Sequence, residues 1–455
     1  MQKVFQKLVS IGMISILLLS GCGKSQTLES KDQEGDNMNG TTNNEVEVTL
    51  NTTAEVTPTN AAAADEADNT KLPIEFSPVT YQGKVINNGN FIKGVDISSV
   101  IALEAAGVKY YNTAGQEEDI FQIFKDAGIN YVRVRVWNDP YLSTAKVKTP
   151  QNSYGGGICD VNYAVEIGKR CTAVGMSLYI DFHYSDFWSD PGRAYAPKAW
   201  ANMNLDEKSK ALYDFTTQSL NTIKASGVTI GIVGVGNETT NFMSGEKGIH
   251  NYVKLIKSGA EAVRAFDPNI LVAVHFTNPE SHNYLHNYAD ILNEGGVDYD
   301  IFASSYYPIW HGTIENMQKQ LNAVAQKYGK LTMIAEYSYY HSGNVSAELQ
   351  KTFGPADEKG QTNAIIVINK AASEIANCIG TFYWEPAWIN ADKSTWATMG
   401  TGWITQNAVE YDLSNASITE AKGSDCTNQT LFDASGKPLY AITSEVFNRI
   451  WKDRQ

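Results

Sequence analysis

The sequence predicts a (β/α)8 barrel, a TIM barrel, preceded by a signal peptide and a disordered tether. Eight short runs rich in β-branched and aromatic residues follow one another between residues 91 and 386. Several of the segments between them have apolar residues at helical spacing, and the eight units occupy about 360 residues. A doubly wound open sheet is the alternative, but no glycine-rich phosphate loop follows the first run.

The chain begins with the features of a bacterial lipoprotein signal. Two lysines precede an apolar run from Leu8 to Leu19, which is right for a signal peptide and short for a membrane span. The run ends in LLSGC, which resembles a lipobox whose cysteine, Cys22, is lipidated. We expect residues 1–21 to be removed and the lipid to hold the protein on the outer face of a bacterial cell membrane. An ordinary secretory signal, which would make the protein secreted, and a transmembrane anchor are the alternatives.

The next segment, residues 22–75, is predicted to be a disordered acidic linker. It consists mainly of Asn, Thr, Ala, Glu and Asp and has almost no large apolar residues. Between residues 24 and 75, eleven acidic residues and three lysines give a net charge of about −8, more than half of the formal −14 of the chain. Such a segment cannot bury enough apolar surface to fold. Residues 76–455 are therefore the predicted (β/α)8 domain.

Charge and cysteine content limit the partners. A net charge of −14 and a pI near 5.0 argue against nucleic acid and anionic polymers, because the field of the protein repels both. Besides Cys22 the chain has Cys159, Cys171, Cys378 and Cys426, without C-x-x-C spacing, so a structural zinc site is not expected. An extracellular compartment permits disulfides, but we expect mostly free thiols. We further expect a monomer without cofactor or metal.

The predicted strands alternate with helical patterns along the chain. In order, the strands are FIKGVDI, YVRVRVW, SLYIDFHY, TIGIVGVGNE, ILVAVHFT, DIFASSYYP, TMIAEYS and IGTFYWEP. Among the segments between them, residues 117–128 and 162–175 repeat apolar residues on one face and end in glycine. A third pattern, residues 251–268, ends in proline.

The second predicted strand, residues 131–137, carries charge toward the barrel interior. Its three valines share one face, which we expect to pack on the helices, whereas Arg133 and Arg135 share the other face with the tyrosine and the tryptophan. Arginine inside a barrel is costly unless it meets a carboxylate. The strand therefore predicts a charged cluster at the mouth, where the carboxyl ends of the strands carry the chemistry of such barrels.

Two predicted strands end in glutamate. Glu238 ends the fourth strand and follows Asn237, and Glu336 ends the seventh strand before an aromatic run. A surface salt bridge would explain one such residue, but two at the mouth of one barrel suit retaining glycoside hydrolysis. In that reaction one carboxyl group protonates the leaving oxygen and the other attacks the anomeric carbon. Asn237 is then expected to bind the 2-hydroxyl of the sugar.

Several further residues are candidates for this site. Arg135, nearest the mouth, is expected to hold Glu336 ionised, with a structural ion pair as the alternative. Tyr307 is expected to hydrogen-bond Glu336, although Tyr306 remains possible from sequence alone. Trp384 is a candidate for the floor under the cleaved sugar, because flat aromatic rings suit the apolar faces of pyranoses.

The third strand adds an inward-facing pair, Asp181 and His183, that is expected to contact the sugar or to support the residues that do. Asp96 on the first strand is a similar candidate, and His275 on the fifth is ambiguous. Four tryptophans in the mouth loops are candidates for lining the groove or for core packing: Trp188, Trp200, Trp310 and Trp388.

These motifs resemble those of clan A, the large clan of retaining barrel glycosidases, and within it family 53, the arabinogalactan endo-β-1,4-galactanases. The likeness extends from about residue 94 to residue 439, and DFHYSDFWSDPG…PKAW is its most specific stretch. Other matching stretches are GVDISSV, VGVGNETTNF, SYYPIWHGT, IAEYSYY and FYWEPAWI. The resemblance implies that Glu238 is the acid/base and Glu336 the nucleophile. It also implies β-1,4-galactan, the type I arabinogalactan side chain of pectin, as substrate.

One departure concerns calcium, which some bacterial members bind in the loop after the seventh strand. Here that loop, residues 341–361, has Asp357 and Glu358 side by side but no oxygen-rich alternation of acidic residues, so calcium is not expected. Two other functions remain open from sequence. One is another clan A endo-β-glycanase, such as a mannanase or glucanase, and the other is a lipid-anchored sugar-binding protein.

Overall fold

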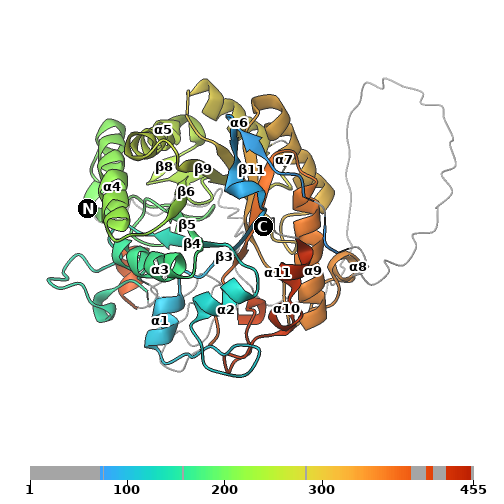
Figure 1. The fold of residues 1–455 in the computed structure, drawn as a ribbon. Coiled ribbons are helices and arrows are strands. Elements are labelled where there is room, and N and C mark those ends of the chain that lie inside the picture. The colour runs from blue at the N-terminus through green and yellow to red at the C-terminus, as the bar shows by residue number, and fades with distance from the viewer. Residues whose placement is uncertain are drawn as a thin grey trace, which may run out of the picture.

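The computed structural model describes residues 72–74, 76–155, 158–281, 284–390, 406–412 and 427–451. Eight parallel strands close into a barrel in the order β10-β11-β12-β3-β4-β5-β6-β9, surrounded by helices (Figure 1). The strands are β3 (Ile92–Asp96), β4 (Tyr131–Val136), β5 (Ser177–Phe182), β6 (Ile230–Val235), β9 (Leu271–Phe276), β10 (Ile301–Ser305), β11 (Leu331–Tyr337) and β12 (Cys378–Trp384). The predicted (β/α)8 fold and all eight predicted strands are confirmed. The predicted signal peptide and Cys22 lie outside the described residues.

Helices follow the strands in the predicted alternation. They are α1 (Val100–Ala105), α2 (Ile120–Asp126), α3 (Val161–Ala173), α4 (Leu205–Ala225), α5 (Ile249–Phe266), α6 (Tyr284–Glu294), α7 (Ile314–Tyr328), α8 (Ala347–Phe353), α9 (Glu358–Ser373), α10 (Tyr440–Thr443) and α11 (Val446–Ile450). The side chains of Asp119 and Asp160 accept backbone N–H groups at the start of α2 and α3, which explains where both helices begin. Helix α5 ends just before the proline that predicted its end.

Two apolar cores lie on opposite faces of the strands. Val132, Val134 and Val136 belong to the larger core between the strands and the helices. Tyr131 belongs to a smaller core inside the barrel together with Phe382. The predicted inward and outward faces of β4 are therefore confirmed, and its arginines lie inside the barrel above the small core.

A hairpin, β1 (Thr80–Tyr81) and β2 (Lys84–Val85), lies at the barrel end opposite the mouth. Tyr81 packs against the inner core, and Lys84 Nζ lies 2.7 Å from Asn269 Oδ1, just before β9 begins. The hairpin thus covers the amino-terminal ends of the strands and leaves the opposite end for the site.

The folded unit begins earlier than predicted. Ile74 N–H donates to Ile450 O at 2.7 Å, and the ring of Phe76 packs edge-on against Trp451. The predicted linker boundary at residue 75 is therefore wrong by a few residues, because the apolar residues of LPIEF pack on the carboxyl-terminal helices. None of the helices in the described ranges has the length and apolar character needed to cross a membrane.

The described cysteines are buried thiols. Cys159, Cys171 and Cys378 take part in no disulfide, and burial raises the thiol pKa of each to about 12. Cys426 lies outside the described residues. Thiols this buried and this weakly acidic are inert packing groups.

Candidate active site

Local backbone geometry presents the two glutamates at the barrel mouth. After β6 the chain turns sharply through Gly236 (φ +89°) and Glu238 (φ 43°), both in the left-handed region. Between β10 and β11 the register shifts at Ser305, so that Ser305 pairs with Glu336. Such turns and bulges re-aim side chains and are common at functional sites.

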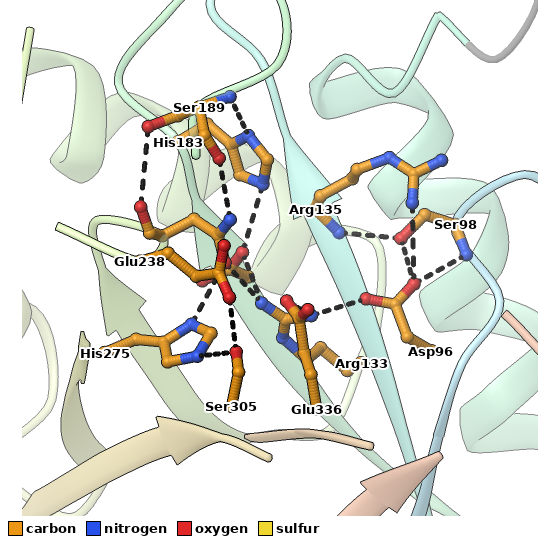
Figure 2. Close-up of polar contacts among 12 residues, drawn as sticks. Asp96, Ser98, Arg133, Arg135, His183, Ser189, Glu238, His275, Ser305 and Glu336 are labelled. Carbon is orange, nitrogen blue, oxygen red and sulfur yellow. Dashed lines mark hydrogen bonds and ion pairs between the residues drawn. The ribbon is translucent and has the colours of Figure 1, made fainter. Parts of the chain in front are cut away.

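Arg133 lies at the centre of the site (Figure 2). Its Nη1 lies 2.7 Å from Glu336 Oε1 and 2.8 Å from Asp96 Oδ2. Its Nη2 lies 2.8 Å from both Asp181 Oδ2 and Asn237 Oδ1. One buried guanidinium therefore joins side chains from β3, β5 and β11 and from the turn after β6, which is the charged cluster that the sequence predicted.

Arg135 contacts a different carboxylate from the one predicted. Its Nη1 lies 2.6 Å from Glu385 Oε1, and the other oxygen of Glu385 accepts from Ser99 Oγ at 2.7 Å. The expectation that Arg135 holds Glu336 is wrong, because Glu336 reaches Arg133, two residues deeper in β4. The structural ion pair that was the alternative is the one present.

Glu385 is a buried charged residue that the sequence reasoning missed. It follows β12 with a φ of 52° and is 1% exposed. Burial raises its pKa to about 7, although the positive charge of Arg135 opposes the rise. The signal was available, because Glu385 ends a strand as the other two glutamates do.

The tyrosine beside Glu336 is identified by the structure. Tyr307 Oη donates to Glu336 Oε2 at 2.8 Å, as expected. Tyr306 Oη instead donates to Gly312 O at 3.0 Å, and its ring lies in the outer core. With Arg133 on one oxygen of Glu336 and Tyr307 on the other, the carboxylate has a fixed orientation.

The inward residues of β5 and its extension act as support. His183 Nδ1 accepts from Trp137 Nε1 at 3.1 Å, so the ring proton is on Nε2, which donates to Asp181 Oδ2 at 3.2 Å. Asp181 and Asp96 are both 0% exposed, and His183 is 2% exposed. Burial of this degree favours support of Arg133 over direct contact with a sugar.

The mouth tryptophans divide into two groups. Trp384 is half-buried, with its ring edge-on to Tyr307, and Trp310 is 38% exposed beside the same tyrosine. Trp188 is 8% exposed and stacks over Arg135, whose Cζ lies 4.4 Å from the ring centroid. Trp388 is 0% exposed and Trp200 is 6% exposed, so of the two roles that the sequence left open, both residues have the packing role and do not line a groove.

Glu238 and Glu336 differ in what surrounds their carboxyl groups. Burial and the negative charge of Glu336 raise the pKa of Glu238 to about 8. Burial also raises the pKa of Glu336 above its usual value, but Arg133 and the Tyr307 hydroxyl act directly on that carboxylate to lower it. The arrangement therefore favours the proton on Glu238 over Glu336, because only the Glu336 carboxylate contacts Arg133 and Tyr307 directly.

The loop after β11 is held by hydrogen bonds. His341 N–H donates to Asn428 O at 2.7 Å. Asp357 and Glu358 of this loop have structural roles: Asp357 Oδ1 accepts from Gly360 N–H at the start of α9, and Glu358 accepts from Tyr440 N–H. In the described part of the chain, no group of three His, Cys, Asp or Glu side chains could hold a metal ion.

Comparison with known proteins agrees with this geometry. The sequence profile of glycosyl hydrolase family 53 matches residues 92–445. The chain belongs to glycosyl hydrolase family 53. The matched range contains all eight barrel strands and every site residue described above, whereas the hairpin β1–β2 precedes it.

Proteins with similar sequences include galactanases. An endo-beta-1,4-galactanase of Bacillus subtilis is 47% identical over 372 residues, which cover 78% of this chain and 85% of the relative. An arabinogalactan endo-beta-1,4-galactanase of Humicola insolens is 29% identical over 79% of this chain and 99% of its own. The family 53 catalytic domain of Ignisphaera aggregans superimposes with a TM-score of 0.68 at 30% identity, covering 84% of this chain and all of that domain.

Proposed function

We propose that this protein is a retaining endo-β-1,4-galactanase that hydrolyses the galactan of type I arabinogalactan. The observation that carries the proposal is the unequal pair at the mouth, in which Glu336 contacts Arg133 and Tyr307 while Glu238 has a pKa of about 8. The 47% identity with the Bacillus galactanase supports the choice of galactan among β-glycans.

In the first step, the Glu336 carboxylate attacks the anomeric carbon and Glu238 gives its proton to the leaving glycosidic oxygen. In the second step, Glu238 removes a proton from water, the water oxygen bonds to the anomeric carbon, and the bond to Glu336 breaks. Arg133 and Tyr307 hold Glu336 ionised and oriented for the attack, and they stabilise the carboxylate again when it leaves.

Asn237 is positioned to bind the sugar during both steps. Its Nδ2 donates one proton to Ser189 O at 2.8 Å and has a second N–H. We assign that second N–H to the 2-hydroxyl of the sugar, a contact that strengthens in the transition state. Trp384 is the proposed floor under the cleaved sugar, and the more exposed Trp310 the proposed contact for a neighbouring one.

A substrate panel tests this function. We expect release of reducing ends from debranched galactan, with little release from mannan or cellulose-type glucan at equal enzyme concentration. Hydrolysis of mannan or glucan in preference to galactan would replace the proposed substrate while leaving the two glutamates in their roles. Binding of galactan without hydrolysis would contradict the enzymatic function itself.

We also propose that Cys22 carries a lipid that holds the catalytic domain at the outer face of a bacterial membrane, as a monomer. The lipobox-like LLSGC and the acidic linker support this assignment. Cys22→Ser should move galactanase activity from the membrane fraction to the medium without changing kcat. Activity that stays in the membrane fraction would contradict the anchor.

Light scattering of the released domain measures its mass and so tests whether it is a monomer. The expected absence of a metal is tested with a chelator, which should change neither the activity nor the Tm.

A further inference from the structure

A chain of polar contacts runs from Asn237 to the carboxyl group of Glu238. His275 Nδ1 lies 3.0 Å from Asn237 Oδ1, and His275 Nε2 lies 2.9 Å from Ser305 Oγ. Ser305 Oγ in turn lies 2.6 Å from Glu238 Oε1 (Figure 2). His275 and Ser305 are both 0% exposed, so bulk solvent does not reach them and the contacts within the protein decide their hydrogen bonds.

The orientation of Asn237 determines the first proton of this chain. Its Oδ1 accepts from Arg133 Nη2 and its Nδ2 donates to Ser189 O. Arginine only donates and a backbone carbonyl only accepts, so a flipped amide would lose both contacts. The atom of Asn237 that faces His275 is therefore an acceptor, and Nδ1 of His275 carries a proton.

The second nitrogen of His275 is then an acceptor. Burial lowers the pKa of His275 to about 3, and the positive charge of Arg133 lowers it further than the negative charge of Asp181 raises it. His183 and His311 also face the ring and act in the lowering direction. A neutral imidazole with its proton on Nδ1 accepts at Nε2, so the Ser305 hydroxyl proton belongs on the His275 side.

This leaves Ser305 without a proton for Glu238. A serine hydroxyl has one proton and can accept through its oxygen. When Glu238 is protonated, its O–H donates to Ser305, Ser305 donates to His275, and His275 donates to Asn237, so that every contact joins a donor to an acceptor. When Glu238 is ionised, Ser305 can satisfy either Glu238 or His275, and the other contact then joins two acceptors.

We propose that Ser305 and His275 are positioning residues that hold the proton on Glu238, by accepting from its carboxyl group through a chain of fixed direction. The proposal rests on the proposed function, in which Glu238 is the acid/base. When Glu238 gives its proton to the leaving oxygen, the Ser305 O–H rotates from His275 to the new carboxylate. It rotates back when Glu238 takes a proton from water in the second step.

The direction of these hydrogen bonds predicts a change in the pKa of Glu238 opposite to the change that an ordinary serine–carboxylate contact would give. If Ser305 only donated to ionised Glu238, its removal would raise the pKa of Glu238. In the proposed chain its removal takes an acceptor from the protonated form, so the pKa of Glu238 falls. The other charges that act on Glu238, those of Glu336, Asp190 and Arg133, remain in place in both cases.

The test is the pH profile of kcat/KM on galactan for Ser305→Ala and His275→Asn. The asparagine amide can keep the donor toward Asn237 but has no group at the position of Nε2. We expect the basic limb to move to lower pH by about one unit in both variants, as one lost hydrogen bond implies. Ser304→Ala is the matched control, because the Ser304 hydroxyl contacts the backbone carbonyl of Ser305 and should leave the limb in place.

A basic limb that stays in place or moves to higher pH in either variant would overturn the proposal. If one of the two variants fails to fold, the pH profile of the other variant decides. Infrared titration gives a readout independent of activity. The protonated-carboxyl band that disappears in Glu238→Gln should titrate at lower pH in Ser305→Ala than in the wild type. Full activity of Glu238→Ala on galactan would instead refute the role of Glu238, so the two failures are distinguishable.

Discussion

At the scale of single residues, the site depends on giving two similar carboxyl groups different surroundings. Glu336 receives Arg133 at 2.7 Å and the Tyr307 hydroxyl at 2.8 Å, both of which favour its ionised form. Glu238 contacts Ser305, and burial together with the charge of Glu336 raises the pKa of Glu238. Because the two groups titrate as a coupled pair, the limbs of a pH profile belong to the pair as well as to each residue.

The two glutamates should respond differently to removal. Glu336→Ala should lose activity on every substrate, because no covalent intermediate can form. Glu238→Ala should lose most activity on galactan but keep the first step on an aryl galactoside whose leaving group needs no proton. Initial rates on both substrates provide the measurement, and full activity of either variant on galactan would contradict its assignment.

Removal of the Tyr307 hydroxyl should shift the acidic limb of kcat/KM. Tyr307→Phe takes a donor from ionised Glu336, so the pKa of Glu336 rises and the acidic limb moves to higher pH by about one unit. Tyr306→Phe is the control, because its hydroxyl donates to Gly312 O away from Glu336. An acidic limb that moves equally in both variants would show that the effect is not transmitted through this hydrogen bond.

At the scale of elements, the barrel is joined internally by ion pairs between strand ends. Arg135 of β4 meets Glu385 just after β12, across β3, and both side chains are almost fully buried. Glu385 directly follows Trp384, the proposed sugar platform, and Trp188 stacks over Arg135. The same ion pair therefore holds the backbone on which one side of the site is built.

Breaking this ion pair should destabilise the fold. Glu385→Ala leaves Arg135 buried without its close carboxylate, so the free energy of unfolding should fall by about 3–5 kcal/mol. Glu117→Ala removes half of an exposed pair with Lys109 and should cost less than about 1 kcal/mol. Urea unfolding at neutral pH measures the free energy of unfolding of both variants. Equally small decreases in the two variants would mean that the buried pair does not stabilise the fold.

At the scale of the whole molecule, both ends of the described chain meet at one side of the barrel. Ile74 forms a parallel bridge with Trp451, and Phe76 packs on Phe91, just before the first barrel strand. The hairpin of residues 80–85 covers the inner core next to this contact. Residues 72–90 thus belong to the catalytic domain although they precede the range that the family profile matches.

Truncation distinguishes the role of the acidic linker from that of residues 72–90. A chain that starts at Leu72 should keep the kcat and Tm of the full chain, because the acidic linker has almost no large apolar residues that could pack on the domain. A chain that starts at Phe91 should have a clearly lower Tm, since it exposes the inner core and uncovers Trp451. Scanning calorimetry and galactan hydrolysis measure both, and an unchanged Tm on removal of residues 72–90 would contradict their structural role.

Much of the barrel was readable from sequence because its signals are local. Alternation along β4 showed which side chains point inward, and the apolar spacing within residues 117–128 predicted the helix that the structure shows as α2. Glu238 and Glu336 were recognisable because both end apolar strands, and strand ends are where barrel chemistry lies. The boundary at residue 75 was misplaced, since the packing of Phe76 on Trp451 joins residues at opposite ends of the chain.

Only the tertiary structure decided which groups meet. Alternation places Arg133 and Arg135 on the same face, but the stagger between neighbouring strands determines how deep each lies and hence which carboxylate it reaches. The register shift at Ser305 pairs that residue with Glu336 of β11, its hydroxyl contacts Glu238, and nothing in the local sequence marks the shift. The sequence by itself therefore determined the strands, their faces and the two glutamates. The pairing of arginines, tyrosines and hydroxyls with those glutamates was decided by register, which arises from hydrogen bonds between strands that are distant along the chain.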